Sequence, residues 1–133
     1  MAGTDAISLS QTLECGQCFR WERLEDGSYR GVAGGRELQV CERELPAVLR
    51  DTFWARYFDM DRDYGAIRAR LCELDPVLAE AAHYAPGIRI LNQDPWETLC
   101  SFILSQANNI PRIRGLVRRL CALCGPEIGN GVR

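Results

Sequence analysis

The spacing of apolar residues changes near the middle of the chain, and this change restricts the fold more than any other feature. Polar and apolar residues mix with a period near two in three segments, 19–24, 28–32 and 36–41. The turn sequences Asp26-Gly27 and Gly34-Gly35 separate these segments, which predicts three antiparallel strands. From Asp63 onward the apolar residues recur at helical spacing. The pattern predicts an α+β fold in which a small antiparallel sheet comes first and helices follow.

Residues that cap helices mark the second half of the chain. Asp63 and Asp75 are placed to cap two helices, and a short aromatic-rich stretch before them is expected to lie over the sheet as a turn of helix. Asp94 opens a third helix, with Glu97 placed to complete a capping box. A fourth helix is predicted over about 110–123. The side chains expected to be buried by the last two helices are Trp96, Leu99, Cys100, Ile103, Ile113, Leu116, Val117, Leu120 and Cys124.

The last two predicted helices carry more apolar surface than the rest of the chain is expected to cover. This indicates a helical layer that is started and not finished. The pattern is typical of a truncated chain or of a piece of a larger protein.

Composition excludes several classes of function. All 16 basic residues are arginine, so no lysine side chain can form a Schiff base. The net charge is −2, yet residues 98–133 hold five arginines and a single acidic residue, which favours a local phosphate site. No apolar stretch approaches the ~20 residues that cross a bilayer, and residues 1–10 lack the basic start of a secretory signal. We expect a cytoplasmic protein with no membrane partner.

The seven cysteines leave two interpretations. Cys15 and Cys18 form one Cys-x-x-Cys pair, and Cys121 and Cys124 form another, so the four could ligate zinc. Their separation in sequence is much longer than in compact zinc sites. Buried reduced thiols are the favoured alternative, and we expect no cofactor.

Three segments together resemble one family. They are Gln11-Thr-Leu-Glu-Cys-Gly-Gln-Cys-Phe-Arg-Trp21, Tyr57-Phe-Asp-Met-Asp-Arg-Asp-Tyr64, and Gly87-Ile-Arg-Ile-Leu-Asn-Gln-Asp-Pro-Trp-Glu97 running on through Ser105-Gln-Ala-Asn-Asn-Ile-Pro-Arg-Ile113. In this order they resemble the 8-oxoguanine DNA glycosylases. The likeness implies that residues 1–88 form the family's N-terminal domain, a small TBP-like sheet packed with helices. It implies that residues 89–133 form the first helices of an incomplete all-α domain, the helix-hairpin-helix domain.

The resemblance implies repair of oxidised purines. Such enzymes flip the damaged base out of double-stranded DNA, cut its glycosidic bond with a lysine nucleophile and an assisting aspartate, and then cleave the strand as a lyase. Nothing in this chain matches that lysine or aspartate, so the chain alone is expected to be catalytically inactive. We expect the full-length protein to be a monomer that needs no cofactor. The alternative function is a non-catalytic module that binds damaged DNA or another partner.

The resemblance also implies site residues. Gly16 and Gln17 fall where the family binds the lesion, and a glycine carbonyl there reads the N7 hydrogen that 8-oxoguanine has and guanine lacks. Arg112 matches the arginine that contacts the unpaired cytosine, and Asn108 and Asn109 fall in the loop that enters the gap. Asn109 is equally well placed as a helix cap. The family's first asparagine is Ala107 here, which weakens the expected contact with cytosine.

Three further arginines near the end of the chain leave two interpretations. Arg114, Arg118 and Arg119 can each meet a phosphate, or they can form a solvated basic face.

Overall fold

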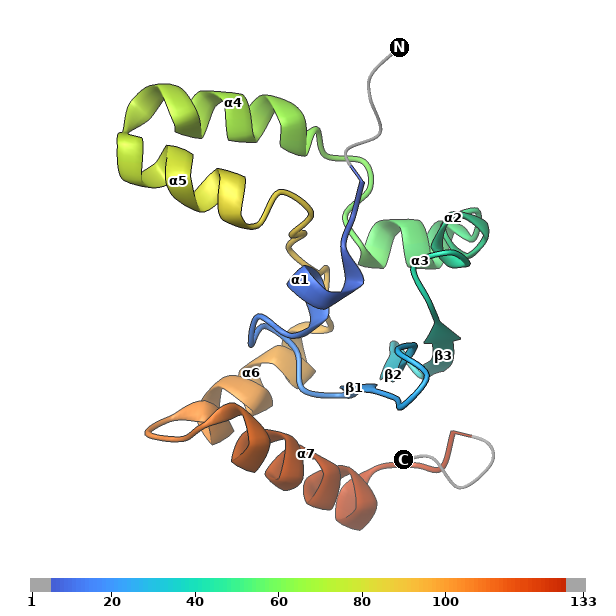
Figure 1. Cartoon of the computed structure of the whole chain (residues 1–133). Coiled ribbons are helices and arrows are strands. Elements are labelled where there is room, and N and C mark those ends of the chain that lie inside the picture. Colours follow the sequence, from blue (N-terminus) through green and yellow to red (C-terminus); the bar gives the residue numbers. More distant parts are fainter. Residues whose placement is uncertain (1–5, 129–133) are drawn as a thin grey trace.

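The computed structural model describes residues 6–128 as three strands and seven helices (Figure 1). The strands are β1 (Trp21–Arg23), β2 (Tyr29–Ala33) and β3 (Arg36–Val40). The helices are α1 (Leu9–Leu13), α2 (Leu45–Val48), α3 (Thr52–Tyr57), α4 (Tyr64–Leu74), α5 (Pro76–Tyr84), α6 (Pro95–Ser105) and α7 (Ile110–Cys124). The α+β class predicted from the sequence is confirmed.

The sheet is the antiparallel meander that the glycine turns predict. Its strand order is β1-β2-β3, with Trp21 opposite Gly31 and Gly31 opposite Leu38. Gly27, Gly34 and Gly35 all adopt positive φ, a conformation that costs glycine nothing and other residues about 1–2 kcal/mol. The turns therefore place the strands in register through local sequence alone.

Aromatic side chains fill the space between the sheet and α3. Trp21 is 2% exposed and packs edge-on against Trp54, with ring centroids 6.2 Å apart. Its indole N–H donates to the Tyr57 hydroxyl at 2.9 Å. Phe58 is fully buried beside them. The expectation that the aromatic segment covers the sheet is confirmed, although it forms two short helices, α2 and α3, in place of one turn.

The predicted caps all form. The carboxylates of Asp63, Asp75 and Asp94 accept from the backbone N–H groups of Ala66, Val77 and Glu97 at 2.9, 2.7 and 2.9 Å. The side chain of Asn109 likewise accepts from the Arg112 N–H at 3.1 Å. The Glu97 carboxylate does not complete a capping box, because it pairs with Arg20 at 3.3 Å.

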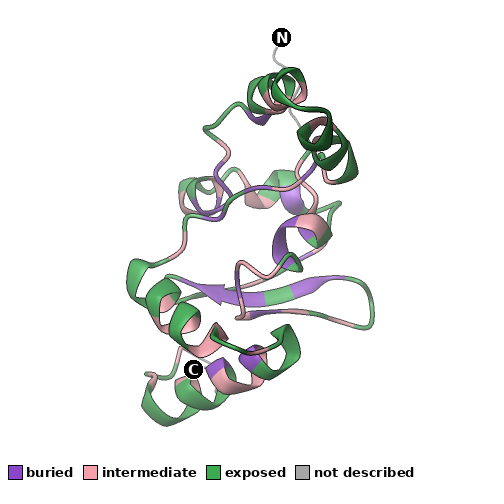
Figure 2. Cartoon of the chain, turned by 90° about the vertical axis from the view of Figure 1, so that its left-hand side faces the viewer, coloured by how far each residue is buried: buried purple, intermediate pink, exposed green. Residues whose placement is uncertain are grey.

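The helices after residue 63 form two antiparallel pairs at opposite ends of the molecule. α4 packs on α5 at one end and α6 on α7 at the other, with α1 between them (Figure 1). Figure 2 shows that buried residues concentrate on the sheet and α3, whereas the helical pairs are largely exposed.

The burial predicted for α6 is wrong in most positions, and that for α7 holds in part. Trp96 is 71% exposed and Ile103 62%, and Leu99 is exposed as well. On α7, Ile113 and Val117 are buried as expected. Leu120 and Cys124 are exposed. No residue of α6 is buried, because its apolar face finds few partners among residues 6–128.

α1 is the element that the sequence did not indicate. Ser8 caps it, and Leu9 and Leu13 enter the sheet core with no exposed surface. The helix has only five residues, too few for helical periodicity to be recognised. It places the following loop, 14–18, beside the segment 87–93.

Candidate nucleic-acid interface

Four of the five predicted site residues line one cleft. It has a volume of about 720 Å³ and lies between the loop after α1 and the helical pair α6–α7. Gly16 and Gln17 line it from the loop, and Asn108 and Asn109 line it from the α6–α7 connection. The remaining wall is mostly α6 and the start of α7. The fold thus brings together residues that are about 90 positions apart in sequence.

Gly16 occupies a position that only glycine suits. Its φ is +89°, and a Cβ there would lie 3.3 Å from the Ile110 Cδ1 atom. Ile110 begins α7, so this close approach sets the loop against the opposite wall of the cleft. Among residues 6–128 the Gly16 carbonyl accepts no hydrogen bond from the protein. The carbonyl of this cleft-lining residue is therefore available to accept a hydrogen bond.

Both polar atoms of the Gln17 side chain form hydrogen bonds within the protein. Its amide nitrogen donates to the carbonyls of Thr12 and Arg89, both at 2.8 Å. Its amide oxygen accepts from the Leu91 N–H at 2.9 Å. The side chain fastens the loop to segment 87–93.

The α6–α7 connection has an unusual backbone at Ala107. Its φ is +51°, in the left-handed region that non-glycine residues seldom enter. The Asn108 amide donates to the Leu104 carbonyl at 3.1 Å and accepts from the Asn109 N–H at 3.2 Å. Asn109 caps α7, so the capping role weighed for it is confirmed. A DNA-contacting role is compatible with that cap, since Asn109 also lines the cleft.

Arg112 stands apart from the cleft lining. It lies in the first turn of α7 and is exposed, with its backbone N–H held by Asn109. The cleft thus gathers Gly16, Gln17, Asn108 and Asn109, and leaves Arg112 on the adjoining surface of the helix.

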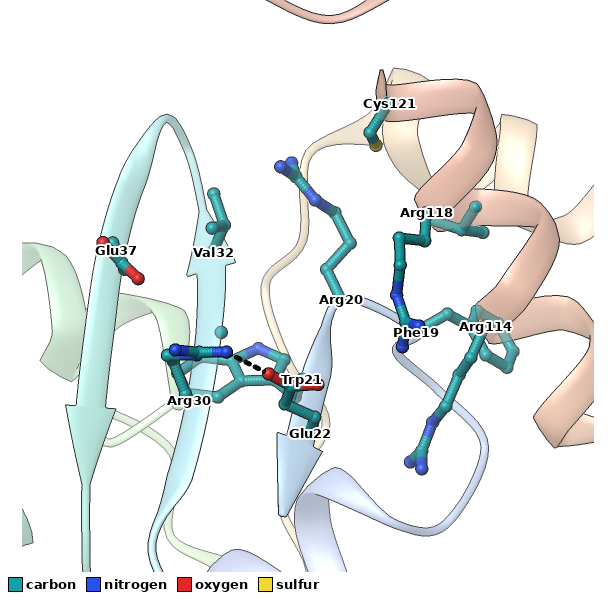
Figure 3. Close-up of a pocket in the computed structure, with 12 residues that line it drawn as sticks. Phe19, Arg20, Trp21, Glu22, Arg30, Val32, Glu37, Arg114, Arg118 and Cys121 are labelled. Carbon is teal, nitrogen blue, oxygen red and sulfur yellow. Dashed lines mark hydrogen bonds and ion pairs between the residues drawn. The ribbon is translucent and has the colours of Figure 1, made fainter. Parts of the chain in front are cut away.

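A second cavity, of about 380 Å³, lies between the sheet and α7 (Figure 3). Arg114 and Arg118 reach it from α7, and Arg20 and Arg30 reach it from the sheet side. Arg30 pairs with Glu22 at 2.6 Å and Arg20 with Glu97. The Arg114 Nε atom is buried and has no hydrogen-bond partner among residues 6–128. Sequence reasoning singled out the α7 arginines but missed Arg20 and Arg30, because their convergence depends on sheet–helix packing.

Burial alters the acidity of groups near both cavities. It raises the pKa of the Glu97 carboxyl, and the adjacent Arg20 guanidinium partly offsets this. It also raises the pKa of the Cys18 thiol from 9.0 to about 12. Cys18 is therefore a neutral, packed thiol, as the reduced-thiol interpretation predicts. Cys15 and Cys124 are exposed, so the burial expected for them is wrong.

The zinc alternative finds no support in the part of the chain that is described. Residues 6–128 contain no group of three or more histidine, cysteine, aspartate or glutamate side chains placed to hold a metal ion. Cys18 is buried in the sheet core, whereas Cys124 is exposed at the end of α7. The same residues include no helix long and apolar enough to span a bilayer.

Comparison with known proteins identifies relatives along nearly the whole chain. A yeast (Saccharomyces cerevisiae) N-glycosylase/DNA lyase is 59% identical over 140 aligned residues, covering 90% of this chain and 37% of the yeast protein. N-glycosylase/DNA lyase OGG1 of Arabidopsis thaliana is 25% identical, covering 93% of this chain and 37% of its own length. This chain thus spans well under half of each curated relative.

Solved structures show similarity to the same kind of protein. A Clostridium acetobutylicum 8-oxoguanine glycosylase/lyase, crystallised with double-stranded DNA containing cytosine opposite 8-oxoG, superposes with a TM-score of 0.80 at 35% identity. The match covers 97% of this chain and 47% of that one. A structure of MBOgg1 with a low-affinity DNA ligand has a TM-score of 0.74 at 42% identity, covering 90% and 44%. A family model described as the N-terminal domain of 8-oxoguanine DNA glycosylase matches residues 2–99. This chain belongs to the 8-oxoguanine DNA glycosylase family.

Proposed function

We propose that this chain is the lesion-reading part of a glycosylase and DNA lyase that excises 8-oxoguanine from double-stranded DNA. In this proposal residues 1–88 form the sheet domain and residues 89–133 the first helices of the helix-hairpin-helix domain. The observation that carries it is the unused Gly16 carbonyl at a residue lining a cleft that also contains Asn108 and Asn109.

The chemistry of the lesion explains why such a carbonyl suffices. 8-Oxoguanine carries a hydrogen on N7, whereas guanine presents a lone pair there. A carbonyl oxygen aimed at N7 gains a hydrogen bond with the lesion and meets like partial charge with guanine. One neutral hydrogen bond contributes about 0.5–1.5 kcal/mol net, which corresponds to a preference of about tenfold at the upper end.

The α6–α7 connection would meet the strand opposite the lesion. Asn108, Asn109 and Arg112 are proposed to contact the cytosine that base flipping leaves unpaired. A guanidinium offers several donors in one plane, which suits the O2 and N3 acceptors of cytosine. Ala107 supplies no donor, so we expect weaker discrimination of the opposite base than three asparagines would give.

Excision is not expected from this chain alone. It contains no lysine to attack the sugar. It spans 37% of each curated relative, and the lysine and aspartate are proposed to belong to the part that has no counterpart here. The full-length protein is proposed to act in the cytoplasm as a monomer whose partner is damaged double-stranded DNA.

Fluorescence anisotropy with two duplexes tests this function. The 133-residue chain should bind an 8-oxoguanine:cytosine duplex about tenfold more tightly than the matched guanine:cytosine duplex. Gly16→Ala should abolish the preference. Gly35→Ala is the matched control, because Gly35 also has positive φ (+75°), has no atom within 4 Å of the place a Cβ would occupy, and lies outside the cleft.

Equal affinity of the unmodified chain for both duplexes would refute lesion reading. Release of free 8-oxoguanine from the duplex by this chain would refute the expectation that it is inactive. Alanine keeps the backbone carbonyl, so Gly16→Ala acts only by displacing it, through the strained φ and the contact of the new Cβ with Ile110. A preference that survives in Gly16→Ala would refute this displacement.

A further inference from the structure

We propose that Gln17 is a positioning residue, which fixes the peptide carrying the Gly16 carbonyl and so sets how well the cleft distinguishes the lesion from guanine. The proposal rests on the function proposed above, and it assigns Gln17 an indirect role. Glycine has no Cβ, so its backbone is freer than that of any other residue and can adopt positive φ. The orientation must therefore come from the neighbours of Gly16.

A row of hydrogen bonds joins α1 and the following loop to segment 87–93 without any strand pairing. At its first end the Gly87 N–H donates to the Gln11 side chain at 2.7 Å, and the Gly87 carbonyl accepts from the Ser8 N–H at 2.8 Å. The buried Thr12 hydroxyl then donates to the Gly87 carbonyl at 3.3 Å and accepts from the Arg89 N–H at 3.2 Å. Side chains thus bond to the backbone N–H and carbonyl groups of segment 87–93, which a neighbouring strand would bond in a sheet.

Gln17 continues this row at its other end. Its amide bridges the Arg89 carbonyl and the Leu91 N–H at 2.8 and 2.9 Å. The Gln93 amide donates back to the Gln17 carbonyl at 2.6 Å. Gln17 is thus held through both its side chain and its backbone. The Gly16 carbonyl shares one planar peptide unit with the Gln17 N–H. Holding the Gln17 side chain and carbonyl fixes the end of that unit, so the Gly16 carbonyl can turn only by rotation about the single bonds that flank the unit.

Segment 87–93 is itself immobilised. The Arg89 side chain is 4% exposed, and its guanidinium lies 4.3 Å from the Tyr64 ring centroid. The Tyr64 hydroxyl accepts from the Ile90 N–H at 2.8 Å and donates to the buried Asp59 carboxylate at 2.7 Å. Gln17 is therefore fastened to a rigid frame and not to a loop that could move with it.

A direct contact between the Gln17 side chain and the base would compete with this arrangement. Both carbonyls that its amide reaches would lose a donor, and leaving such partly buried groups unpaired costs about 1–3 kcal/mol each. The geometry accordingly favours action through Gly16.

Two substitutions in the same row separate positioning from general stability. Gln17→Met keeps the length of the side chain and removes the three hydrogen bonds that this side chain makes to backbone groups. Thr12→Val removes two bonds of the row but leaves the 16–17 peptide untouched, so it is the matched control. Both should lower the urea midpoint. Only Gln17→Met should reduce the lesion preference, from about tenfold toward equal binding.

NMR relaxation of the free protein gives a readout that does not depend on DNA. In the unmodified chain and in Thr12→Val, backbone order parameters at Gly16 and Gln17 should stay near ~0.85, and in Gln17→Met they should fall below ~0.6. If Gln17→Met does not fold, Gln93→Met removes only the bond onto the Gln17 carbonyl. That variant should then show a smaller fall both in the lesion preference and in the order parameters at Gly16 and Gln17.

The outcomes distinguish the two proposals. Lesion preference retained in Gln17→Met, or lost equally in Thr12→Val, overturns the positioning role while lesion reading stands. If the unmodified chain shows no preference, lesion reading fails, and the order parameters alone decide: a fall confined to Gln17→Met supports positioning, and unchanged values overturn it.

Discussion

The strained backbone of Ala107 makes an unusual prediction, namely that replacing alanine with glycine stabilises the protein. Ala107 has φ +51° two residues after the end of α6, a position where glycine or asparagine normally ends a helix. Left-handed backbone costs a non-glycine residue about 1–2 kcal/mol. Glycine removes that cost but gives the unfolded chain about 0.4–1 kcal/mol of extra conformational freedom. The free energy of unfolding of Ala107→Gly should therefore rise by about 0.5 kcal/mol.

Urea denaturation measures the effect, and Ala69→Gly is the matched control. Ala69 is exposed inside α4, where the same change should cost about 0.5–1 kcal/mol. With a slope of about 2 kcal/mol per molar urea, the midpoint should rise by about 0.25 M in Ala107→Gly and fall by about 0.25–0.5 M in Ala69→Gly. The expected result is therefore that the urea midpoint shifts in opposite directions when the two exposed alanines are each replaced with glycine. Equal destabilisation would refute the left-handed conformation at Ala107.

Three further predictions concern the core, its acidity and the basic helix. Tyr57→Phe should lower the free energy of unfolding by about 1–3 kcal/mol, because the buried Trp21 indole N–H loses its acceptor; chemical denaturation measures this. Stability should fall as pH rises from 9.0 to about 12, since the folded state keeps Cys18 protonated while the unfolded thiol ionises. The urea midpoint of Cys18→Ala should depend less on pH across that range. Arg118→Ala should reduce the salt dependence of DNA binding by about 0.9 in the log–log slope, and exposed Arg70→Ala should leave it unchanged.

Each of these has a clear contrary result. An unchanged midpoint in Tyr57→Phe would mean that water replaces the lost acceptor. A pH profile identical in Cys18→Ala would assign the alkaline loss to other groups, such as Tyr29, whose pKa burial raises to about 12. Equal salt slopes for the two arginine variants would assign Arg118 to a solvated basic face.

Local sequence predicted the parts of the fold that depend on local chemistry. Asp63, Asp75 and Asp94 cap helices because a short carboxylate reaches the N–H groups of the next turn whatever surrounds it. The glycine turns determined the strand register for the same reason. Burial was harder to predict: Trp96 is apolar and correctly placed on a helix, yet it is 71% exposed, because burial depends on which partners the fold supplies.

The candidate site shows the same division. The resemblance singled out Gly16 and Asn108, and their approach across the cleft follows from packing of α7 on the loop. No residue pattern indicated the hydrogen bonds between Gln17 and segment 87–93, since they join positions 72 to 76 apart. The sequence shows only polar residues at 11, 12 and 17, a pattern that on its own is typical of a surface loop.

The connection between the Gly16 loop and segment 87–93 also bears on how such a site can evolve. A ladder of backbone hydrogen bonds is indifferent to most substitutions, because every residue type except proline supplies the same N–H and carbonyl. Here side chains of Gln11, Thr12, Gln17 and Gln93 form most of the bonds. Each of these side-chain bonds can therefore be removed by a single substitution. Under the positioning role proposed for Gln17, single substitutions in this row of hydrogen bonds change substrate preference without altering any residue that contacts the base.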